Sequence, residues 1–89
     1  MPYIKKEDRA ILDPKIDSLA SKMSDDFNPG WFNYVVTRLI LKMAVDPSKL
    51  TYKHIALITG VLENIKQEFY RRVAAPYEDA KIAENGDVF

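Results

Sequence analysis

The chain has 89 residues, of which 47% are hydrophobic and 11% aromatic, with no cysteine and a formal net charge of zero. This length allows one domain at most, the composition favours a packed core over a disordered chain, and the lack of cysteine excludes disulfides and thiolate metal sites. No stretch has the apolar run of a signal peptide or of a membrane span, so we expect a soluble cytoplasmic protein with no membrane partner.

The first third of the chain predicts a short helical turn followed by a medium helix. The turn can form over Lys5–Leu12. Asp13 and Pro14 are typical of an N-cap followed by a proline in the first helical turn, where the missing N–H of proline costs nothing. The helix that they open has apolar residues at the spacing i, i+3, i+4, i+7, namely Ile16, Leu19, Ala20 and Met23.

The segment Trp31–Ala44 is the most hydrophobic part of the chain. A connector of residues 25–30 precedes it, and Asn28 in this connector can cap a helix. The β-branched residues of the segment leave a strand as the alternative, but alternation with period two fails, and Arg38 and Lys42 lie one helical turn apart. The segment therefore predicts a helix that is apolar around most of its circumference and covered on more than one side.

A second break at residues 45–49, with Asp46 as the cap of a short turn, precedes the longest predicted helix, Tyr52–Ala75, which Thr51 caps. Leu57 and Val61 form a narrow apolar stripe on this helix. The main stripe repeats at alternating spacings of three and four and consists of Ile55, Ile58, Leu62, Ile65, Phe69 and either Arg72 or Val73.

Gly60, the pair of Glu68 and Arg72, and Pro76 lead to further predictions for the longest helix. Gly60 lies in its middle, where glycine costs about 1 kcal/mol relative to alanine, and either the close approach of another helix or simple tolerance explains it. Glu68 and Arg72 have the i,i+4 spacing and the favoured polarity of a helical ion pair. Pro76 is then expected to end the helix or to kink it sharply.

Beyond Pro76, residues 78–84 predict a last short helix, and Asn85 with Gly86 predicts its stop. The predicted fold class is therefore all-α: a small helical bundle of two long helices, one medium helix and short terminal helices, in a single domain of residues 1–89. Because the long helices carry more than one apolar stripe, we expect oligomerisation to complete the bundle.

The charges are unevenly distributed along the chain. Residues 31–75 carry seven basic and three acidic side chains, whereas residues 76–89 carry one basic and four acidic side chains. This acidic, aromatic tail of residues 76–89 is predicted to pack on the domain or on a neighbouring subunit, although chance scatter of charge is the alternative. Neither segment is basic enough to argue for a nucleic-acid partner by charge alone.

Residues with catalytic or metal-binding chemistry are sparse. His54 is the only histidine, and its position close to Thr51 favours a capping or surface role over a metal ligand. The three glycines form no phosphate loop, no serine has the surroundings of a nucleophile, and adjacent carboxylates on a helix point in different directions. The sequence therefore predicts no enzyme, no catalytic residue, no metal and no cofactor.

Arginines and tyrosines supply the best candidate for a ligand site. Arginine forks bind phosphate or carboxylate in a bidentate manner, and a tyrosine ring can stack on a base or cover the edge of a core. Alternatively, the arginines hold the acidic tail through Glu78, Asp79 or Asp87. The candidate ligand-binding residues are Arg38, Lys42, Tyr70, Arg71, Arg72 and Tyr77.

Several blocks of the sequence resemble a family of short proteins, about 90 residues long, that occurs in bacteriophages and bacteria. These blocks are MPYIKKEDR at 1–9, NYVVTRLI at 33–40, FYRR at 69–72, APYED at 75–79 and ENGDVF at 84–89. The family has no established activity, so the resemblance implies a phage or prophage origin and a cytoplasmic location, and no catalytic residue. Small phage proteins often bind host proteins or host signalling nucleotides, which is an analogy of size and origin.

The leading hypothesis is a non-enzymatic, homo-oligomeric binding protein whose partner is a host protein or a small anionic, nucleotide-like ligand. The first alternative is a nucleic-acid accessory protein that uses the basic central helices and binds in a salt-dependent manner. The second alternative is a small phosphohydrolase, which would need Asp46, Glu63 and Glu68 to converge around a metal ion.

Overall fold

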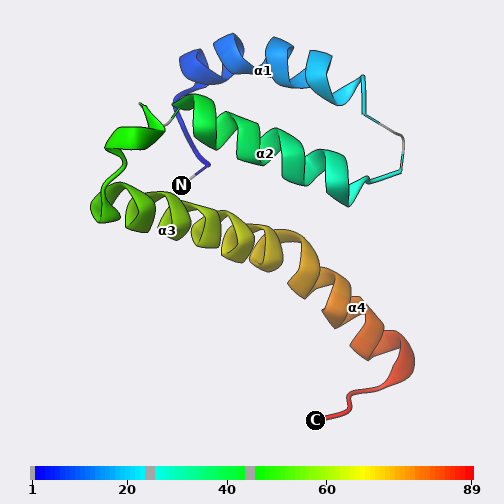
Figure 1. The fold of residues 1–89 in the computed structure, drawn as a ribbon. Helices are drawn as coiled ribbons and strands as arrows, with labels where there is room; N and C mark the ends of the chain where they lie inside the picture. Colours follow the sequence, from blue (N-terminus) through cyan, green and yellow to red (C-terminus); the bar gives the residue numbers. More distant parts are fainter. Residues whose placement is uncertain (1, 24–25, 44–45) are drawn as a thin grey trace. The chain divides into compact units, whose positions relative to one another are not determined.

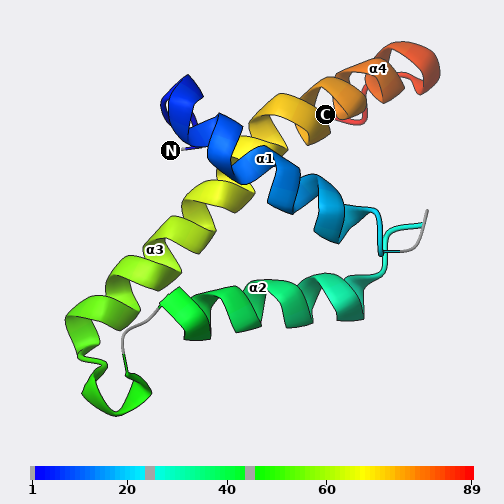
Figure 2. The same ribbon diagram turned by 90° about the horizontal axis from the view of Figure 1, so that it is seen from above.

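The computed structural model describes residues 2–23, 26–43 and 46–89, so the predicted boundary residues Asp25, Ala44 and Val45 lie outside the described part. Within these ranges the chain is helical and has no strand, which confirms the all-α class. It divides into two units, residues 2–54 and residues 55–89. The elements in chain order (Figures 1 and 2) are α1 Lys6–Ala20, α2 Pro29–Met43, the short 3-10 helix η1 Pro47–Lys49, α3 Tyr52–Phe69, the π-helical turn η2 Tyr70–Ala74 and α4 Ala75–Asn85.

Helix α1 begins earlier than the sequence predicts. It starts at Lys6 and runs through Pro14, so the predicted turn and the predicted medium helix are one element, and the predicted start at Asp13 is wrong. A proline keeps a helical φ, but inside a helix it costs one hydrogen bond and its ring crowds the carbonyl four residues back, together about 3 kcal/mol. Helix α1 accommodates Pro14 without a π-helical turn. Glu7 and Asp8 lie in the first turn, where negative charge stabilises the helix dipole.

Helix α2 begins at the cap that the sequence predicts. The side-chain oxygen of Asn28 accepts a hydrogen bond from the backbone N–H of Trp31 at 3.1 Å. The rings of Phe27 and Phe32 lie 5.3 Å apart on either side of this cap, in the positions of a hydrophobic staple that fixes the entry of the chain. The strand alternative for this segment is wrong, because these local interactions favour a helix.

The turn before α3 is also capped as predicted. The carboxylate of Asp46 accepts hydrogen bonds from the backbone N–H and the hydroxyl of Ser48, at 3.0 and 2.7 Å. These bonds lower the pKa of Asp46. The φ of Asp46 is 31°, in the left-handed region that aspartate tolerates better than most residues.

Thr51 and His54 cap α3 reciprocally, which confirms the capping role predicted for His54. The hydroxyl oxygen of Thr51 accepts from the backbone N–H of His54 at 3.4 Å, and the backbone N–H of Thr51 donates to Nδ1 of His54 at 3.4 Å. The Thr51 hydroxyl also lies 3.0 Å from Nδ1. This arrangement follows the capping box, with histidine in the place of glutamate or glutamine.

The long helix does not end at Pro76. Helix α3 continues through the π-helical turn η2 into α4, and the ribbon is unbroken from Tyr52 to Asn85 (Figure 1). The predicted helix of residues 78–84 is thus the later part of α4. Gly86, with φ 91°, ends α4 and donates its backbone N–H to the carbonyl of Ile82 at 2.8 Å, as the predicted stop requires.

The described helices bury no side chain. Large apolar residues are exposed on every long helix, among them Trp31 at 54% and Phe69 at 64%. Ile58 and Leu62 on the main stripe of α3 are half-buried. The predicted apolar stripes are therefore present, but the core that they would form in a bundle is absent from the described part of the chain.

Gly60 provides a test of this open arrangement. Nothing lies within 4 Å of the position where a Cβ would stand on Gly60. We expect Gly60→Ala to stabilise the protein by about 0.5–1 kcal/mol, since alanine loses less backbone entropy in a helix, and to raise the melting temperature by a few degrees. Thermal unfolding followed by circular dichroism measures the effect.

Gly86→Ala is the matched control. Its surroundings are equally open, but its positive φ is unfavourable for any residue with a side chain. This substitution should therefore lower the melting temperature. A lower melting temperature for Gly60→Ala would contradict the open position and would show that another helix approaches closely there.

Candidate functional site

The six predicted ligand-binding residues belong to two separate units. Arg38 and Lys42 lie one turn apart on α2, in the unit of residues 2–54. The other four lie on one continuous helical segment in the unit of residues 55–89: Tyr70, Arg71 and Arg72 in η2, and Tyr77 in the first turn of α4.

The π-helical turn η2 is the most unusual local feature of the second unit. Its hydrogen bonds join each carbonyl to the N–H five residues later, as in the bond from the N–H of Ala75 to the carbonyl of Tyr70. Pro76 follows directly. In an α-helix the ring of Pro76 would clash with the carbonyl of Arg72, four residues back, and the wider turn relieves this clash. The π-helical turn thus lets the helix continue through a proline.

The wider turn also changes which side chains share a face. It holds one residue more than an α-helical turn, so every later side chain is set back by one position, or roughly 100° around the axis. After Phe69 the apolar stripe therefore continues through Val73, which decides between the two predicted positions, and not through Arg72. Tyr77 follows at the same spacing of four. The sequence analysis missed this alignment because a π-helical turn has no simple sequence pattern.

The arginines of η2 differ in their partners. Nη2 of Arg71 lies 2.7 Å from Oε1 of Glu68, whose side chain is only 20% exposed. The predicted i,i+4 ion pair of Glu68 with Arg72 is wrong, since Glu68 pairs one residue earlier. Arg72 forms no ion pair with any residue that the structure describes, and the same holds for Arg38 and Lys42.

Tyr77 lies beside a cation on α4. Nζ of Lys81 lies 5.7 Å from the centre of the Tyr77 ring and 3.3 Å from Oε2 of Glu84. A cation over the face of a tyrosine at an exposed site contributes about 0.5–1 kcal/mol. These contacts keep one face of the Tyr77 ring occupied within its own helix.

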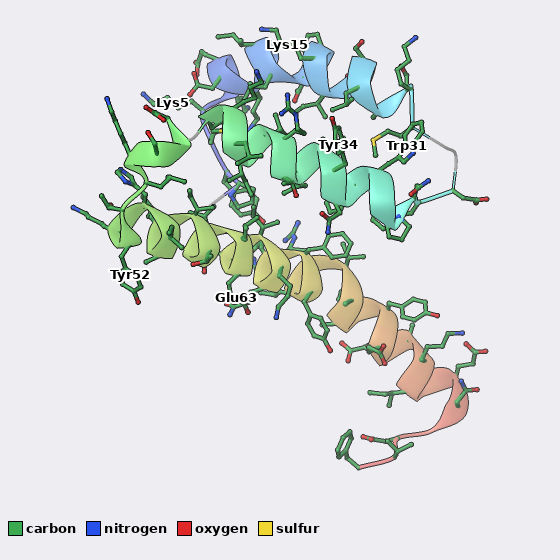
Figure 3. All side chains as sticks on the ribbon, viewed as in Figure 1. Lys5, Lys15, Trp31, Tyr34, Tyr52 and Glu63 are labelled. Atoms are coloured by element: carbon green, nitrogen blue, oxygen red, sulfur yellow. The ribbon has the colours of Figure 1, made fainter. Side chains whose placement is uncertain are left out.

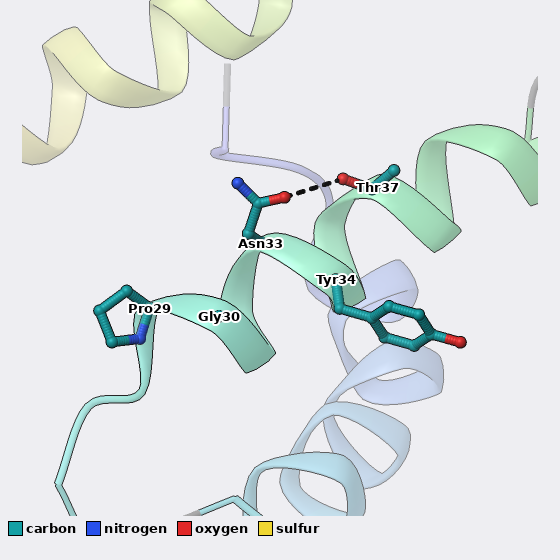
Figure 4. Close-up of a pocket in the computed structure, with 5 residues that line it drawn as sticks. All are labelled: Pro29, Gly30, Asn33, Tyr34 and Thr37. Carbon is teal, nitrogen blue, oxygen red and sulfur yellow. Dashed lines mark hydrogen bonds between the residues drawn. The ribbon is translucent and has the colours of Figure 1, made fainter.

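A shallow hollow on α2 was not predicted from the sequence. It is lined by Pro29, Gly30, Asn33, Tyr34 and Thr37, and the hydroxyl of Thr37 donates to the side-chain oxygen of Asn33 at 3.3 Å (Figure 4). A second, apolar hollow is lined by Trp31, Tyr34 and Val35, and both labelled aromatic residues project from α2 in Figure 3. Tyr34 thus lines both hollows, and Arg38 lies one turn further along the same helix.

Within residues 2–23, 26–43 and 46–89, no three histidine, aspartate or glutamate side chains gather in a way that could hold a metal ion. Asp46, Glu63 and Glu68, which the phosphohydrolase alternative requires to converge, form no such group. None of the helices in the described ranges is long and apolar enough to span a membrane.

The described part of the chain is all-helical, and its long helices expose large apolar side chains. Residues 1–88 match the model of a family described as a domain of unknown function, DUF6899, and the chain belongs to that family. This agrees with the resemblance to a family of short proteins without an established activity. No curated protein and no solved structure matches the chain.

The ion pair between Glu63 and Lys66 on α3 can be tested through the pKa of the Glu63 carboxyl group. Nζ of Lys66 lies 3.1 Å from Oε1 of Glu63, and its hydrogen bond and charge lower the pKa of Glu63, with a smaller effect from Gln67. We expect Lys66→Met to raise the pKa of Glu63 towards the ordinary value of about 4.3. A pH titration followed by nuclear magnetic resonance of the carboxyl carbon measures it.

The matched control is Lys81→Met, which removes a lysine from a similar i,i+3 pair and should leave the pKa of Glu63 unchanged. Because the pKa is lowered in the folded state, the pair stabilises the fold above the unfolded-state pKa, and this contribution is lost as the pH falls through the folded-state pKa. A Glu63 pKa that does not move in Lys66→Met would show that the pair does not form in solution.

Proposed function

We propose that this chain is a non-enzymatic protein that acts by binding, and that it does so as a homo-oligomer. The observation that supports the proposal is the exposure of large apolar side chains on all long helices, with no buried side chain in the described ranges. Burying one such side chain stabilises a fold by about 1.5–3 kcal/mol, whereas ordering the backbone costs about 1–2 kcal/mol per residue. Helices without buried side chains therefore need cover from another surface.

The chemistry of the residues supports binding over catalysis. The chain has no cysteine, and its one histidine has Nδ1 engaged by Thr51 at the start of α3. The proposal includes the phage or prophage origin, the cytoplasmic location and the host-protein partner, which rest on the resemblance to short phage and bacterial proteins.

The oligomer is tested by the molar mass in solution. We expect light scattering to give a multiple of 10.2 kDa at micromolar concentration. Ile65, on the main stripe, is 55% exposed, so Ile65→Asp should place a charge in the interface and weaken association at least about tenfold. Asn64→Asp, which adds the same charge one residue away on a polar face, is the matched control and should associate normally.

A monomer of the wild-type chain at these concentrations would contradict the oligomer, and would show that a single chain covers its own apolar faces. Equal association of the Ile65→Asp and Asn64→Asp variants would contradict the assignment of the main stripe to the interface.

For a small ligand, the residues on α2 favour an anion that carries an aromatic base. Tyr34 is 66% exposed and lies one turn before Arg38, which in turn lies one turn before Lys42. The ring can stack on a base, while the two cations can bind a phosphate group, and neither cation has an ion-pair partner among the described residues.

The ligand is tested by a thermal-shift screen of nucleotides and cyclic nucleotides. We expect at least one nucleotide at high concentration to raise the melting temperature by several degrees, and Arg38→Ala to remove most of that shift. Lys53→Ala, which removes a cation outside the line from Tyr34 to Lys42, is the matched control and should keep the shift. A screen in which no nucleotide raises the melting temperature would contradict a nucleotide-like ligand.

A further inference from the structure

The continuous helix of residues 55–85 carries opposite charges along its length. Residues 66–72 hold Lys66, Arg71 and Arg72 against one acidic residue, a net charge of +2, whereas residues 78–87 hold four acidic residues against Lys81, a net charge of −3. The two segments follow each other along one continuous helix (Figure 1).

This continuity decides whether the acidic segment can reach the arginines of its own chain. Glu78 lies seven residues beyond Arg71, which is roughly 10 Å along a helix axis at 1.5 Å per residue. The helix continues through Pro76, and no ion pair among the described residues joins the arginines of η2 to the carboxylates of α4. The charge attraction that the sequence suggests therefore needs a second chain.

The same helix carries an apolar line between the charged segments. The π-helical turn aligns Phe69, Val73 and Tyr77 at intervals of four residues, and their side chains are 64%, 51% and 61% exposed. Ala74 lies between the two charged segments and next to Val73, and its small side chain permits a close approach of another helix. This surface has an apolar line with a basic segment at one end and an acidic segment at the other. A second copy of the helix in the reverse direction is complementary to it.

We propose that the occupant of this face is a second copy of the chain, with the two helices antiparallel and crossing near Ala74 and Ala75. This proposal rests on the proposed homo-oligomer and specifies its interface. An antiparallel pair places residues 66–72 of each copy beside residues 78–87 of the other, so that opposite charges face each other twice. A parallel pair would place like charges side by side. The antiparallel interface is two-fold symmetric, and both copies use the same surface.

Charge exchange tests the pairing. The double variants Arg71→Glu/Arg72→Glu and Glu78→Lys/Asp79→Lys should each associate at least about tenfold more weakly than the wild type, because each makes the two facing segments alike in charge. An equimolar mixture of the two double variants should form a heterodimer with wild-type affinity, since every facing pair is again opposite. The quadruple variant should form a homodimer. Circular dichroism of each variant shows whether its helices form.

Orientation is tested by the distance between labels, which is simple because the chain has no cysteine. A spin label on Thr59→Cys should lie about 50 Å from its copy in the antiparallel pair, since each label is about 16 residues from the crossing point at 1.5 Å per residue. In a parallel pair the same labels would be separated by little more than the helix spacing of about 8–10 Å. The control label on Ala75→Cys, at the crossing point, should give a short distance.

The possible results separate this inference from the function on which it rests. A monomeric wild type would overturn both. A wild-type oligomer with a short distance for Thr59→Cys, or a mixture of double variants that fails to associate although each is helical, would overturn the antiparallel pairing and leave the homo-oligomer in place. Rescue in the mixture together with a long Thr59→Cys distance would support it.

Discussion

The architecture of the C-terminal unit depends on a proline inside a helix. Pro76 can donate no backbone hydrogen bond, and its ring excludes the carbonyl that would lie four residues before it in an α-helix. The chain responds with the π-helical turn η2, in which the carbonyl of Tyr70 bonds to the N–H of Ala75. This adjustment keeps α3 and α4 in one continuous helix and sets the phase of every later side chain.

Two properties of the helix follow from the π-helical turn: the position of the arginines relative to the apolar line, and the separation of basic from acidic residues along the axis. The change of phase replaces Arg72 by Val73 in the apolar line, so the arginine lies at the edge of a possible interface and not in its middle. The continuation of the helix places the acidic residues of α4 further along the axis than the arginines of η2. Attraction within the helix is thus limited to neighbours such as Glu68 and Arg71, at 2.7 Å. In the proposed antiparallel pair, the basic and acidic segments of one copy face those of the other.

Much of the fold could be predicted from the sequence where short-range chemistry decides the structure. The caps at Asn28, Asp46 and Thr51 each use a side chain within three residues of its partner, and all three form. The start of α1 was predicted wrongly. Asp13 and Pro14 have the pattern of an N-cap and a first helical turn, but the helix already begins at Lys6. The phase after Phe69 could not be predicted, since it depends on how the backbone absorbs Pro76. The six candidate site residues divide between two units, which no spacing along the chain reveals.

The cap of α3 also determines the chemistry of the only imidazole in the chain. A backbone N–H can only donate, so Nδ1 of His54 must act as an acceptor towards Thr51. The ring proton of the neutral side chain is therefore on Nε2, and the outward edge of the ring is a hydrogen-bond donor. In this tautomer neither nitrogen offers a free lone pair to an incoming molecule.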